Sequence, residues 1–208
     1  ELTDTAKAIG AVNTIHMRDN RLIGDNTDAQ GFLTDLKRFL TLECDSLLSH
    51  MQELAPALQK NTLVLGAGGS ARGVVFALLN DGWDVTLAAR RLAQAHQLST
   101  FFTNYELRIT DFTDLRLLTF DLLVNTTSLG MSPNIDQSPL PANLSLPSNT
   151  IIYDLVYNPR ETKLVKDARA KGLFATNGFG MLIEQAALSF EIWTGHNPPR
   201  EIMLSSIS

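Results

Sequence analysis

Cysteine is nearly absent from the chain, and histidine is scarce and scattered. Cys44 is the single cysteine, so the chain forms no internal disulfide and contains no cysteine cluster that could hold a metal. The four histidines show none of the spacings typical of metal ligands: His16, His50, His96 and His196. We therefore expect no metal site and a protein of a reducing compartment.

An excess of basic charge is also lacking. The chain has 17 lysines and arginines against 22 aspartates and glutamates, which gives a formal net charge of −5. Such a chain has no positive field that would draw it onto nucleic acid or an anionic membrane. No apolar run is long enough to span a bilayer, and no signal-peptide pattern opens the chain. These absences predict a cytoplasmic protein that binds neither nucleic acid nor membranes.

What the chain does have is enough apolar sequence for a substantial core, since 44% of its 208 residues are hydrophobic. Six short apolar runs alternate with helix-length segments, a pattern typical of a Rossmann-type α/β fold with a doubly wound, parallel, six-stranded sheet. The expected strands are Thr62–Leu65, Val85–Ala88, Leu107–Ile109, Leu122–Asn125, Ile151–Leu155 and Leu173–Ala175. The expected helices between them are Ala71–Asn80, Leu92–Phe102 and Thr162–Lys171, the last followed by Gly172 as a left-handed terminator.

The two ends of the chain follow a different pattern. Two strands, Ala11–His16 and Arg21–Gly24, are expected around a turn, followed by a helix with apolar residues at helical spacing from Ala29 to Leu40. A further helix is expected around Leu47–Leu54, and an amphipathic helix over Met181–Trp193.

The sharpest motif is a glycine loop between the first expected strand and its helix. It runs Gly66-Ala67-Gly68-Gly69-Ser70-Ala71 and fits the G-x-G-x-x-A form of the dinucleotide fingerprint. Gly66 makes the tight turn, Gly68 lets the backbone approach a pyrophosphate, and the helix N-terminus offers free N–H groups. The alternative is an ordinary glycine turn, but the surrounding alternation of strands and helices favours a nucleotide site.

Two arginines follow the second expected strand, where proteins that bind NAD place a carboxylate to hold the ribose 2′-hydroxyl. Arg90 and Arg91 instead suit a 2′-phosphate, through charge-assisted hydrogen bonds. The alternative is a solvated arginine pair at the start of a helix. The position relative to the glycine loop favours NADP.

Three polar clusters lie outside these motifs. Asn125-Thr126-Thr127 ends the fourth expected strand, at the edge of the sheet where ligands bind in open α/β folds. Asn13 and Asp28 lie in two small, polar segments, Gly10–Thr14 and Gly24–Asp28, and could present an amide and a carboxylate to one polyhydroxylated ligand. Such segments are more often turns and caps, and Asp28 could simply cap the helix that follows it.

Taken in order, these segments resemble the shikimate dehydrogenases. The resemblance covers the whole chain. The matching segments are Ala11–Thr14, Gly24–Asp28, Gly66–Ser70, Asn125–Thr127, Tyr153–Pro159 and Gly178–Leu182. It implies an NADP-dependent oxidoreductase that interconverts 3-dehydroshikimate and shikimate in aromatic amino-acid biosynthesis.

The resemblance also implies roles for individual residues. Asp28 corresponds to the carboxylate of the family's catalytic dyad, whereas Ala89 and Arg91 depart from the family's Asn-Arg-Thr phosphate motif around Arg90. Implied substrate contacts are Asn13, Asp28, Tyr157 and Gln185. Implied cofactor contacts are Gly66, Ala67, Gly68, Gly69, Ser70, Arg90, Arg91, Asn125, Thr126, Leu155 and Gly178.

One part of the family pattern is missing from these 208 residues. The Ser-x-Ser clamp and the Asn-Val-Thr-x-Pro-x-Lys motif that carries the catalytic lysine do not occur, and the chain opens at Glu1 without a methionine. We therefore expect a truncated family member, inactive alone, with a substrate-domain remnant over 1–28, connecting helices over 29–60, an NADP domain over 61–177 and terminal helices over 178–208. Quinate as substrate, a non-catalytic NADP-binding module and a homodimer remain open; the Gly24–Asp28 and Gly178–Gln185 segments argue against a glutamyl-tRNA reductase.

Overall fold

The computed structural model describes residues 1–47, 60–115, 118–141 and 144–206. Its helices are α1 (Asp4–Ile9), α2 (Asp28–Leu47), α3 (Gly69–Asn80), α4 (Leu92–Ser99), α5 (Lys163–Ala170), α6 (Phe179–Thr194) and α7 (Arg200–Ser206). Its strands are β1 (Thr14–Arg18), β2 (Arg21–Asp25), β3 (Asn61–Leu65), β4 (Asp84–Ala88), β5 (Leu107–Thr110), β6 (Leu122–Asn125), β7 (Ile151–Asp154) and β8 (Ala175–Asn177). No helix in these ranges is long and apolar enough to cross a membrane.

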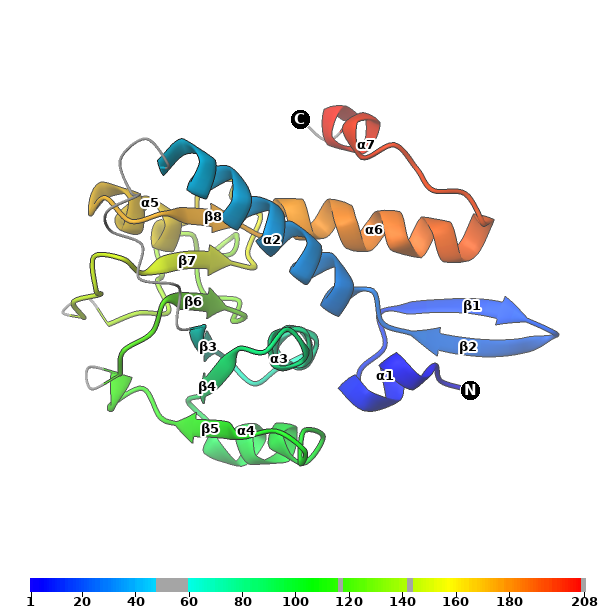
Figure 1. The fold of residues 1–208 in the computed structure, drawn as a ribbon, viewed down its shortest axis with the longest axis horizontal. Helices are drawn as coiled ribbons and strands as arrows, with labels where there is room; N and C mark the ends of the chain where they lie inside the picture. Colours follow the sequence, from blue (N-terminus) through cyan, green and yellow to red (C-terminus); the bar gives the residue numbers. More distant parts are fainter. Residues whose placement is uncertain (48–59, 116–117, 142–143, 207–208) are drawn as a thin grey trace.

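Six strands form one parallel sheet in the order β5-β4-β3-β6-β7-β8 (Figure 1). The path of the chain through this sheet begins in the middle at β3 and runs outward through β4 to β5. It then returns to β6, on the other side of β3. This is the strand order of the doubly wound nucleotide-binding folds, with a topological switch point between β3 and β6. The predicted fold class is confirmed.

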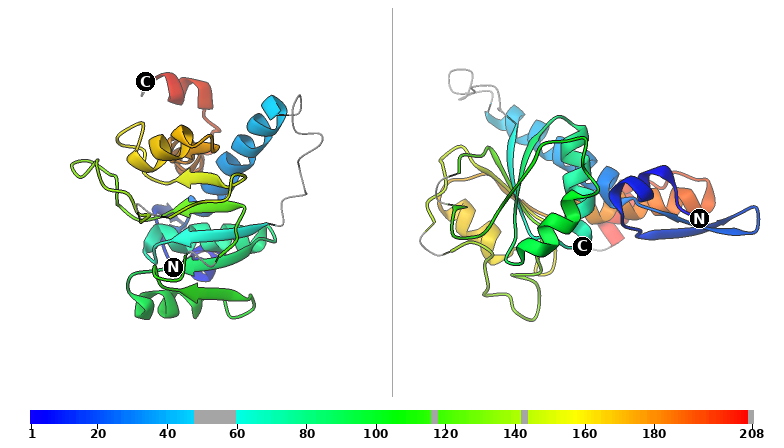
Figure 2. Two further views of the ribbon diagram at one scale, coloured as in Figure 1. Left: turned by 90° about the vertical axis from the view of Figure 1, so that its left-hand side faces the viewer. Right: turned by 90° about the horizontal axis from the view of Figure 1, so that it is seen from below.

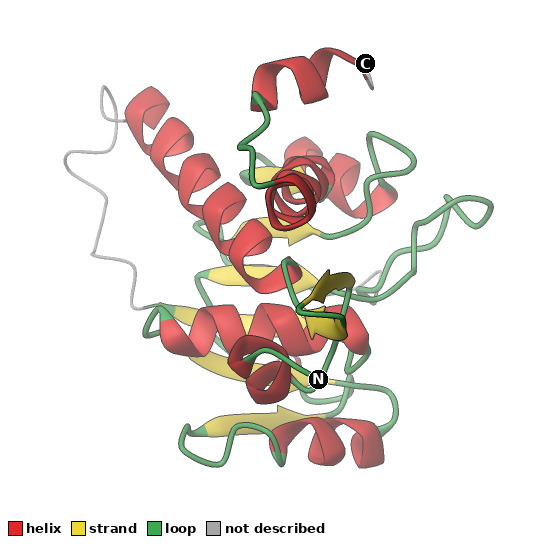
Figure 3. Cartoon of the chain, turned by 90° about the vertical axis from the view of Figure 1, so that its right-hand side faces the viewer, coloured by secondary structure: helices red, strands yellow, loops and turns green. Residues whose placement is uncertain are grey.

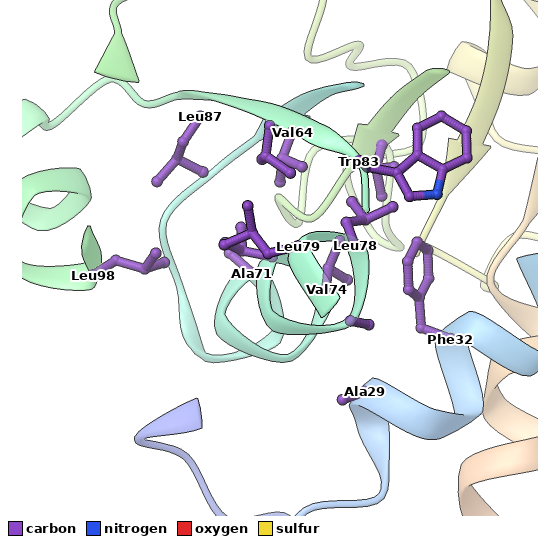
Figure 4. Packing of buried hydrophobic residues seen from close by; sticks show 14 of the residues in the cluster. Ala29, Phe32, Val64, Ala71, Val74, Leu78, Leu79, Trp83, Leu87 and Leu98 are labelled. Carbon is purple, nitrogen blue, oxygen red and sulfur yellow. The ribbon is translucent and has the colours of Figure 1, made fainter. Parts of the chain in front are cut away.

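The sheet lies between two hydrophobic clusters because its strands are apolar on both faces. On one face, residues of α2, α3 and α4 form a cluster with Val64 and Val124 of the sheet. Figure 4 shows part of this cluster, with Val64 beside residues of α3. On the other face, α5 packs against Leu63 and Leu123, together with apolar residues of the loops that precede β6 and β7. Figure 3 shows the helices on the two sides of the strands. The sheet is therefore a rigid platform whose carboxyl edge can position loops.

The amino-terminal residues form a small unit that projects beyond the sheet (Figures 1 and 2). β1 and β2 are an antiparallel hairpin, and Asp19 and Asn20 at its tip have positive φ, as a two-residue hairpin turn requires. The predicted pair of strands is therefore present. The indole of Trp193 at the end of α6 donates to the carbonyl of Ile15, so the last long helix holds the hairpin in place.

The long helices α2 and α6 lie side by side and join this hairpin to the sheet. A Cβ at Gly31 would lie 2.8 Å from the backbone nitrogen of Gln185, so the helices approach too closely for any other residue there. Gly180 likewise makes room for the carboxylate of Asp35, which accepts hydrogen bonds from Arg38 and, at 2.5 Å, from the buried hydroxyl of Tyr153. Burial and the Asp35 carboxylate hold the pKa of Tyr153 well above its usual range.

Several predicted boundaries are wrong by two or more residues, most of all the end of α2, which continues to Leu47 and does not stop at Leu40. The last strand begins at Ala175 and not at Leu173, because the N–H of Leu173 donates to Ala168 and closes α5. Gly172 has positive φ at that point, as expected. The α4 helix ends at Ser99, three residues early, since the N–H of Phe102 turns back to Ser99.

The first strand also starts later than predicted, at Thr14, because Gly10 adopts the left-handed conformation that ends α1. Of the expected helix Leu47–Leu54, Leu47 is the last residue of α2, and the remainder lies outside the described residues.

Candidate functional site at the carboxyl edge of the sheet

The glycine loop lies at the switch point, directly after β3. Gly66 has a φ of 105°, and a Cβ on it would lie 2.8 Å from Oγ1 of Thr126, which follows β6. Position 66 therefore requires glycine because of backbone conformation and the neighbouring strand. In contrast, a Cβ on Gly68 or Gly69 would meet nothing within 4 Å. Packing against the described residues does not explain those two glycines, whereas a ligand lying close to the backbone would.

The loop leads into α3, whose N-terminus is open. Gly68 is the N-cap and provides no side-chain hydrogen bond to the first turn, and Gly68, Gly69 and Ser70 are exposed. The first N–H groups of this twelve-residue helix therefore point outward without a side-chain acceptor. Together with the helix dipole, they form a site suited to a phosphate group.

Next to this loop, the end of β4 presents two arginines. The N–H of Gly66 donates to the carbonyl of Ala88 at 2.8 Å, so the end of β4 is tied to the glycine loop. Arg90 and Arg91 follow and are both exposed, and neither has an ion-pair partner within the described ranges. Two free cations beside a phosphate-binding loop suit an additional phosphate on the same ligand.

On the other side of the switch point, the ends of β6 and β7 lie in register, with Asn125 opposite Asp154. The hydroxyl of Thr126 donates a hydrogen bond to the carbonyl of Leu65, the last residue of β3, at 2.7 Å. Gly178 lies against the chain after β7, where any Cβ would overlap the carbonyl of Leu155. Five of the predicted cofactor positions therefore lie at or just beyond the carboxyl ends of β4, β6 and β7, along one edge of the sheet: Arg90, Arg91, Asn125, Thr126 and Leu155.

The second part of the site is a polar cluster at the junction of β1, α2 and α6. The side-chain nitrogen of Asn13 donates to Oδ1 of Asp28 at 2.8 Å and to Oγ1 of Thr27 at 3.0 Å. It also lies 3.4 Å from Oε1 of Gln185. The structure therefore brings together Asn13, Asp28 and Gln185, three of the four predicted substrate contacts. The fourth, Tyr157, lies in the loop after β7 and is 45% exposed.

Asp28 does not have the capping role that its position allowed. The N–H of Ala29 donates to the side chain of Asn26, which leaves the Asp28 carboxylate to Asn13. Burial raises the pKa of Asp28 above its usual value, and the hydrogen bond from Asn13 opposes that shift. A partly desolvated carboxylate with a raised pKa is better suited to proton exchange than a solvated one.

The cluster and the glycine-loop helix are in contact. A Cβ on Gly73 in α3 would lie 3.3 Å from Cβ of Asp28, so the start of α2 packs directly on the helix that follows the glycine loop. A molecule held at the cluster and a dinucleotide held by the loop would therefore be neighbours.

Sequence reasoning missed the hydroxyl groups that support this cluster. Thr14 and Ser189 are buried with their hydroxyl oxygens 2.7 Å apart, and Thr27 lies 3.1 Å from Ser189. They connect β1, the β2–α2 junction and α6 beneath Asn13. Single threonines and serines 175 positions apart give no signal in a sequence until the packing of α6 on β1 is known.

A doubly wound sheet with a dinucleotide loop at its switch point, two free arginines and an adjacent carboxylate–amide cluster defines a dinucleotide-dependent oxidoreductase. The comparisons with known proteins identify the family. Residues 49–168 match the family described as "Shikimate / quinate 5-dehydrogenase", and residues 178–207 match "Shikimate 5'-dehydrogenase C-terminal domain". The chain belongs to the shikimate dehydrogenase family.

Individual relatives agree with this assignment. "Shikimate dehydrogenase (NADP(+))" of Carboxydothermus hydrogenoformans is 39% identical over 100% of this chain and 70% of its own length. The Thermus thermophilus shikimate 5-dehydrogenase, solved with NADP(H) and shikimate, is 37% identical with a TM-score of 0.77, over 96% of this chain and 68% of that one. The Listeria monocytogenes enzyme, solved with shikimate and NAD, is 27% identical with a TM-score of 0.82, over 100% of this chain and 71% of that one.

Proposed function

We propose that this chain binds NADP(H) along the carboxyl edge of its sheet and presents Asn13, Asp28 and Gln185 to shikimate or 3-dehydroshikimate. The observation that carries the proposal is the packing of the Asp28 cluster on α3, the helix that begins at the glycine loop. Hydride transfer requires substrate and nicotinamide to be in contact, and this packing makes them neighbours.

The residues present fit the cofactor. The uncapped N-terminus of α3 and the open space above Gly68 and Gly69 suit the pyrophosphate, and Arg90 and Arg91 suit the 2′-phosphate. Gly178 and Leu155 lie on the half of the sheet that takes the nicotinamide in folds of this strand order. When bound, NADP(H) supplies or accepts the hydride. Relatives named as NADP(+) enzymes support this choice.

The proposed substrate site is supported by the hydrogen-bonding groups that it offers. Shikimate carries ring hydroxyls, and the Asn13 amide and Asp28 carboxylate offer one donor and one acceptor 2.8 Å apart. Asp28 would accept a hydrogen bond from a ring hydroxyl of the substrate and share the proton of that hydroxyl. The pKa of Asp28, raised by burial, favours this sharing. Gln185 and Tyr157 would complete the contacts from α6 and from the loop after β7.

The resemblance assigns proton exchange to the Asp28 carboxylate together with a lysine, and the family's lysine motif does not occur in these 208 residues. A positioned proton donor typically contributes about 10²- to 10⁴-fold to a rate. We therefore propose that the chain by itself holds the cofactor but turns over shikimate at least about a hundredfold more slowly than a chain carrying that motif.

The test compares two proteins, this chain and the same chain extended at its amino end with the lysine-bearing segment of a relative. NADPH formation is followed by absorbance with shikimate in excess, and NADP binding is titrated in parallel. We expect both proteins to bind NADP and the extended chain alone to turn over readily. Equal turnover by both would refute the role given to the missing motif, and failure of both to bind NADP would refute the cofactor assignment.

Two controls sharpen the result. In the extended chain, Asp28→Asn should lower the rate with little change in NADP affinity, because Asp28 lies at the substrate and not at the phosphates. Running quinate beside shikimate separates the two substrates named in the family description.

The composition supports two further proposals, a cytoplasmic location and no nucleic-acid partner, which rest on the single cysteine and the net charge of −5. A homodimer stays an open expectation that sedimentation tests, and a mass near 22.9 kDa would contradict it.

A further inference from the structure

Asp154, at the end of β7, is a buried carboxylate to which neither the sequence motifs nor the proposed mechanism gives a task. Its exposed fraction is 0%. Burial raises its pKa to about 6, and the groups that act against this shift are three hydrogen-bond donors: Thr162, the backbone of Val156 and Asn125. Among the described residues, this carboxylate has hydrogen-bond donors but no ion-pair partner, and burying a charged group in that way is costly. This cost calls for a function of the carboxylate itself.

The two carboxylate oxygens serve different parts of the molecule. Oδ1 accepts from the side-chain nitrogen of Asn125 at 2.8 Å and from the N–H of Val156 at 3.1 Å. Oδ2 accepts from the hydroxyl of Thr162 at 2.6 Å, the residue that caps α5. Oδ1 therefore holds the loops at the carboxyl edge, whereas Oδ2 holds a helix on the far face of the sheet.

The Oδ1 contact fixes which way the Asn125 amide faces. With its nitrogen turned to Asp154, the Asn125 oxygen accepts from both the N–H of Thr127 at 3.0 Å and its hydroxyl at 2.7 Å. These bonds shape the turn after β6, which lies directly against Gly66: a Cβ there would come within 3.0 Å of the Thr127 methyl. The orientation of one amide thus sets the shape of the turn beside the glycine loop.

The same oxygen also anchors the turn after β7. Oδ1 holds the N–H of Val156, and the carbonyl of Val156 accepts from the N–H of Gly178 at 3.4 Å. In this strand order the β3–β5 half of the sheet takes the adenosine half of a dinucleotide, and the β6–β8 half takes the nicotinamide half. Both turns held by Oδ1 belong to the second half.

We propose that Asp154 is a positioning residue that shapes the nicotinamide half of the cofactor site, through Asn125 and Val156, without touching the cofactor. The inference rests on the proposed function, because it assumes that a dinucleotide binds at this edge. It assigns a task to the Oδ1 side of the carboxylate and predicts that the Oδ2 side can be altered without effect on the cofactor.

The test uses two ligands that divide the site. NADP occupies both halves, whereas 2′,5′-ADP reaches only the glycine loop and the arginines. For Asp154→Ala we expect NADP affinity to fall by about tenfold or more while 2′,5′-ADP affinity changes by less than about twofold. A merely structural role would lower the melting temperature but would not separate the two ligands.

Two matched variants address the two oxygens. Asp154→Asn keeps an oxygen for Asn125 and Val156, so it should retain NADP affinity within about twofold. Thr162→Val removes the donor to Oδ2 and the α5 cap, so it should lower the melting temperature and leave NADP affinity unchanged. If Asp154→Ala does not fold, as judged by circular dichroism, Asp154→Ser replaces it and is judged by the same criteria.

The outcomes are distinct. Equal losses of both ligands, or no loss of NADP, in a folded Asp154→Ala or Asp154→Ser chain would overturn the inference. A loss of NADP affinity in Thr162→Val as large as in Asp154→Ala would overturn it as well. If the unaltered chain binds neither ligand, the proposed function itself is wrong.

Discussion

Removing the guanidinium of Arg90 should lower the preference of this chain for NADPH over NADH by about tenfold and leave the contribution of Arg91 in place. The two cofactors differ in the 2′-phosphate alone, and Arg90 follows β4 beside the glycine loop, at the position where this fold reads that part of the ligand. We expect NADPH affinity to fall in Arg90→Ala and NADH affinity to stay nearly constant.

The size of the expected loss in NADPH affinity depends on how exposed the two arginines are. A hydrogen bond to a charged group contributes about 1.5 to 3 kcal/mol, which corresponds to roughly ten- to a hundredfold in affinity. Both arginines are exposed, where water and salt screen charge, so the lower end of about tenfold applies to each. Arg91 also heads α4 without capping it, so its removal should not unfold that helix.

Calorimetric titration of NADPH and NADH measures this directly, at low and at high salt. Added salt should reduce the preference of the unaltered chain for NADPH, and should reduce that of Arg90→Ala by less, because Arg91 alone remains to be screened. Arg108→Ala is the matched control, because Arg108 is also exposed in the same sheet, 3.8 Å from Glu106. NADH binding as tight as NADPH in the unaltered chain would refute the reasoning, and so would equal losses of both cofactors in Arg90→Ala.

Two further predictions concern the glycine loop and pH. Gly68→Ala should leave the free energy of unfolding within about 0.5 kcal/mol and weaken NADP binding by about tenfold or more, since its Cβ meets no protein atom but occupies ligand space; thermal melts and calorimetry check both parts, and an unchanged affinity would contradict the prediction. The pKa of Asp154, about 6 in the folded chain, lies above the value near 3.9 of an unfolded one, so the folded chain binds the proton more tightly. The contribution of Asp154 to the free energy of unfolding should therefore fall by about 2 kcal/mol as pH rises from about 4 to 6. Asp154→Asn should reduce that fall in urea denaturation at the two pH values, and identical pH profiles would show that Asp154 does not titrate as described.

The parallel sheet and the glycine loop were predictable because their determinants are local. A run such as Leu122–Asn125 is buried on both faces and is marked by its own apolar residues. The glycine loop is specified by consecutive residues, two of which have no packing reason to be glycine. Boundaries were less predictable because they depend on how a helix closes, as with Leu173, whose apolar side chain suggests a strand although its N–H still belongs to the end of α5.

The contacts between distant elements could not be predicted in the same way. Asp35 and Tyr153 are 118 positions apart, and their hydrogen bond exists because Phe32 packs edge-on against the Tyr153 ring and brings α2 onto β7. In the sequence, Asp35 is one more polar residue of an amphipathic helix. Its burial follows from α6 covering the polar side of α2, which Gly180 allows.

Asp154 lies between these two cases. It ends an apolar run and, in parallel strands that start in register, last residues become neighbours, so the pairing of Asn125 with Asp154 follows once β6 is known to lie beside β7. That adjacency is itself a consequence of the strand order that the glycine loop predicts. The sequence does not indicate that this aspartate is buried, because an aspartate at a strand end is usually solvated. Burial is what distinguishes it: a carboxylate with no exposed surface must accept hydrogen bonds from the chain, and two of its three donors, Asn125 and Val156, lie at or just after the ends of β6 and β7 beside the glycine loop.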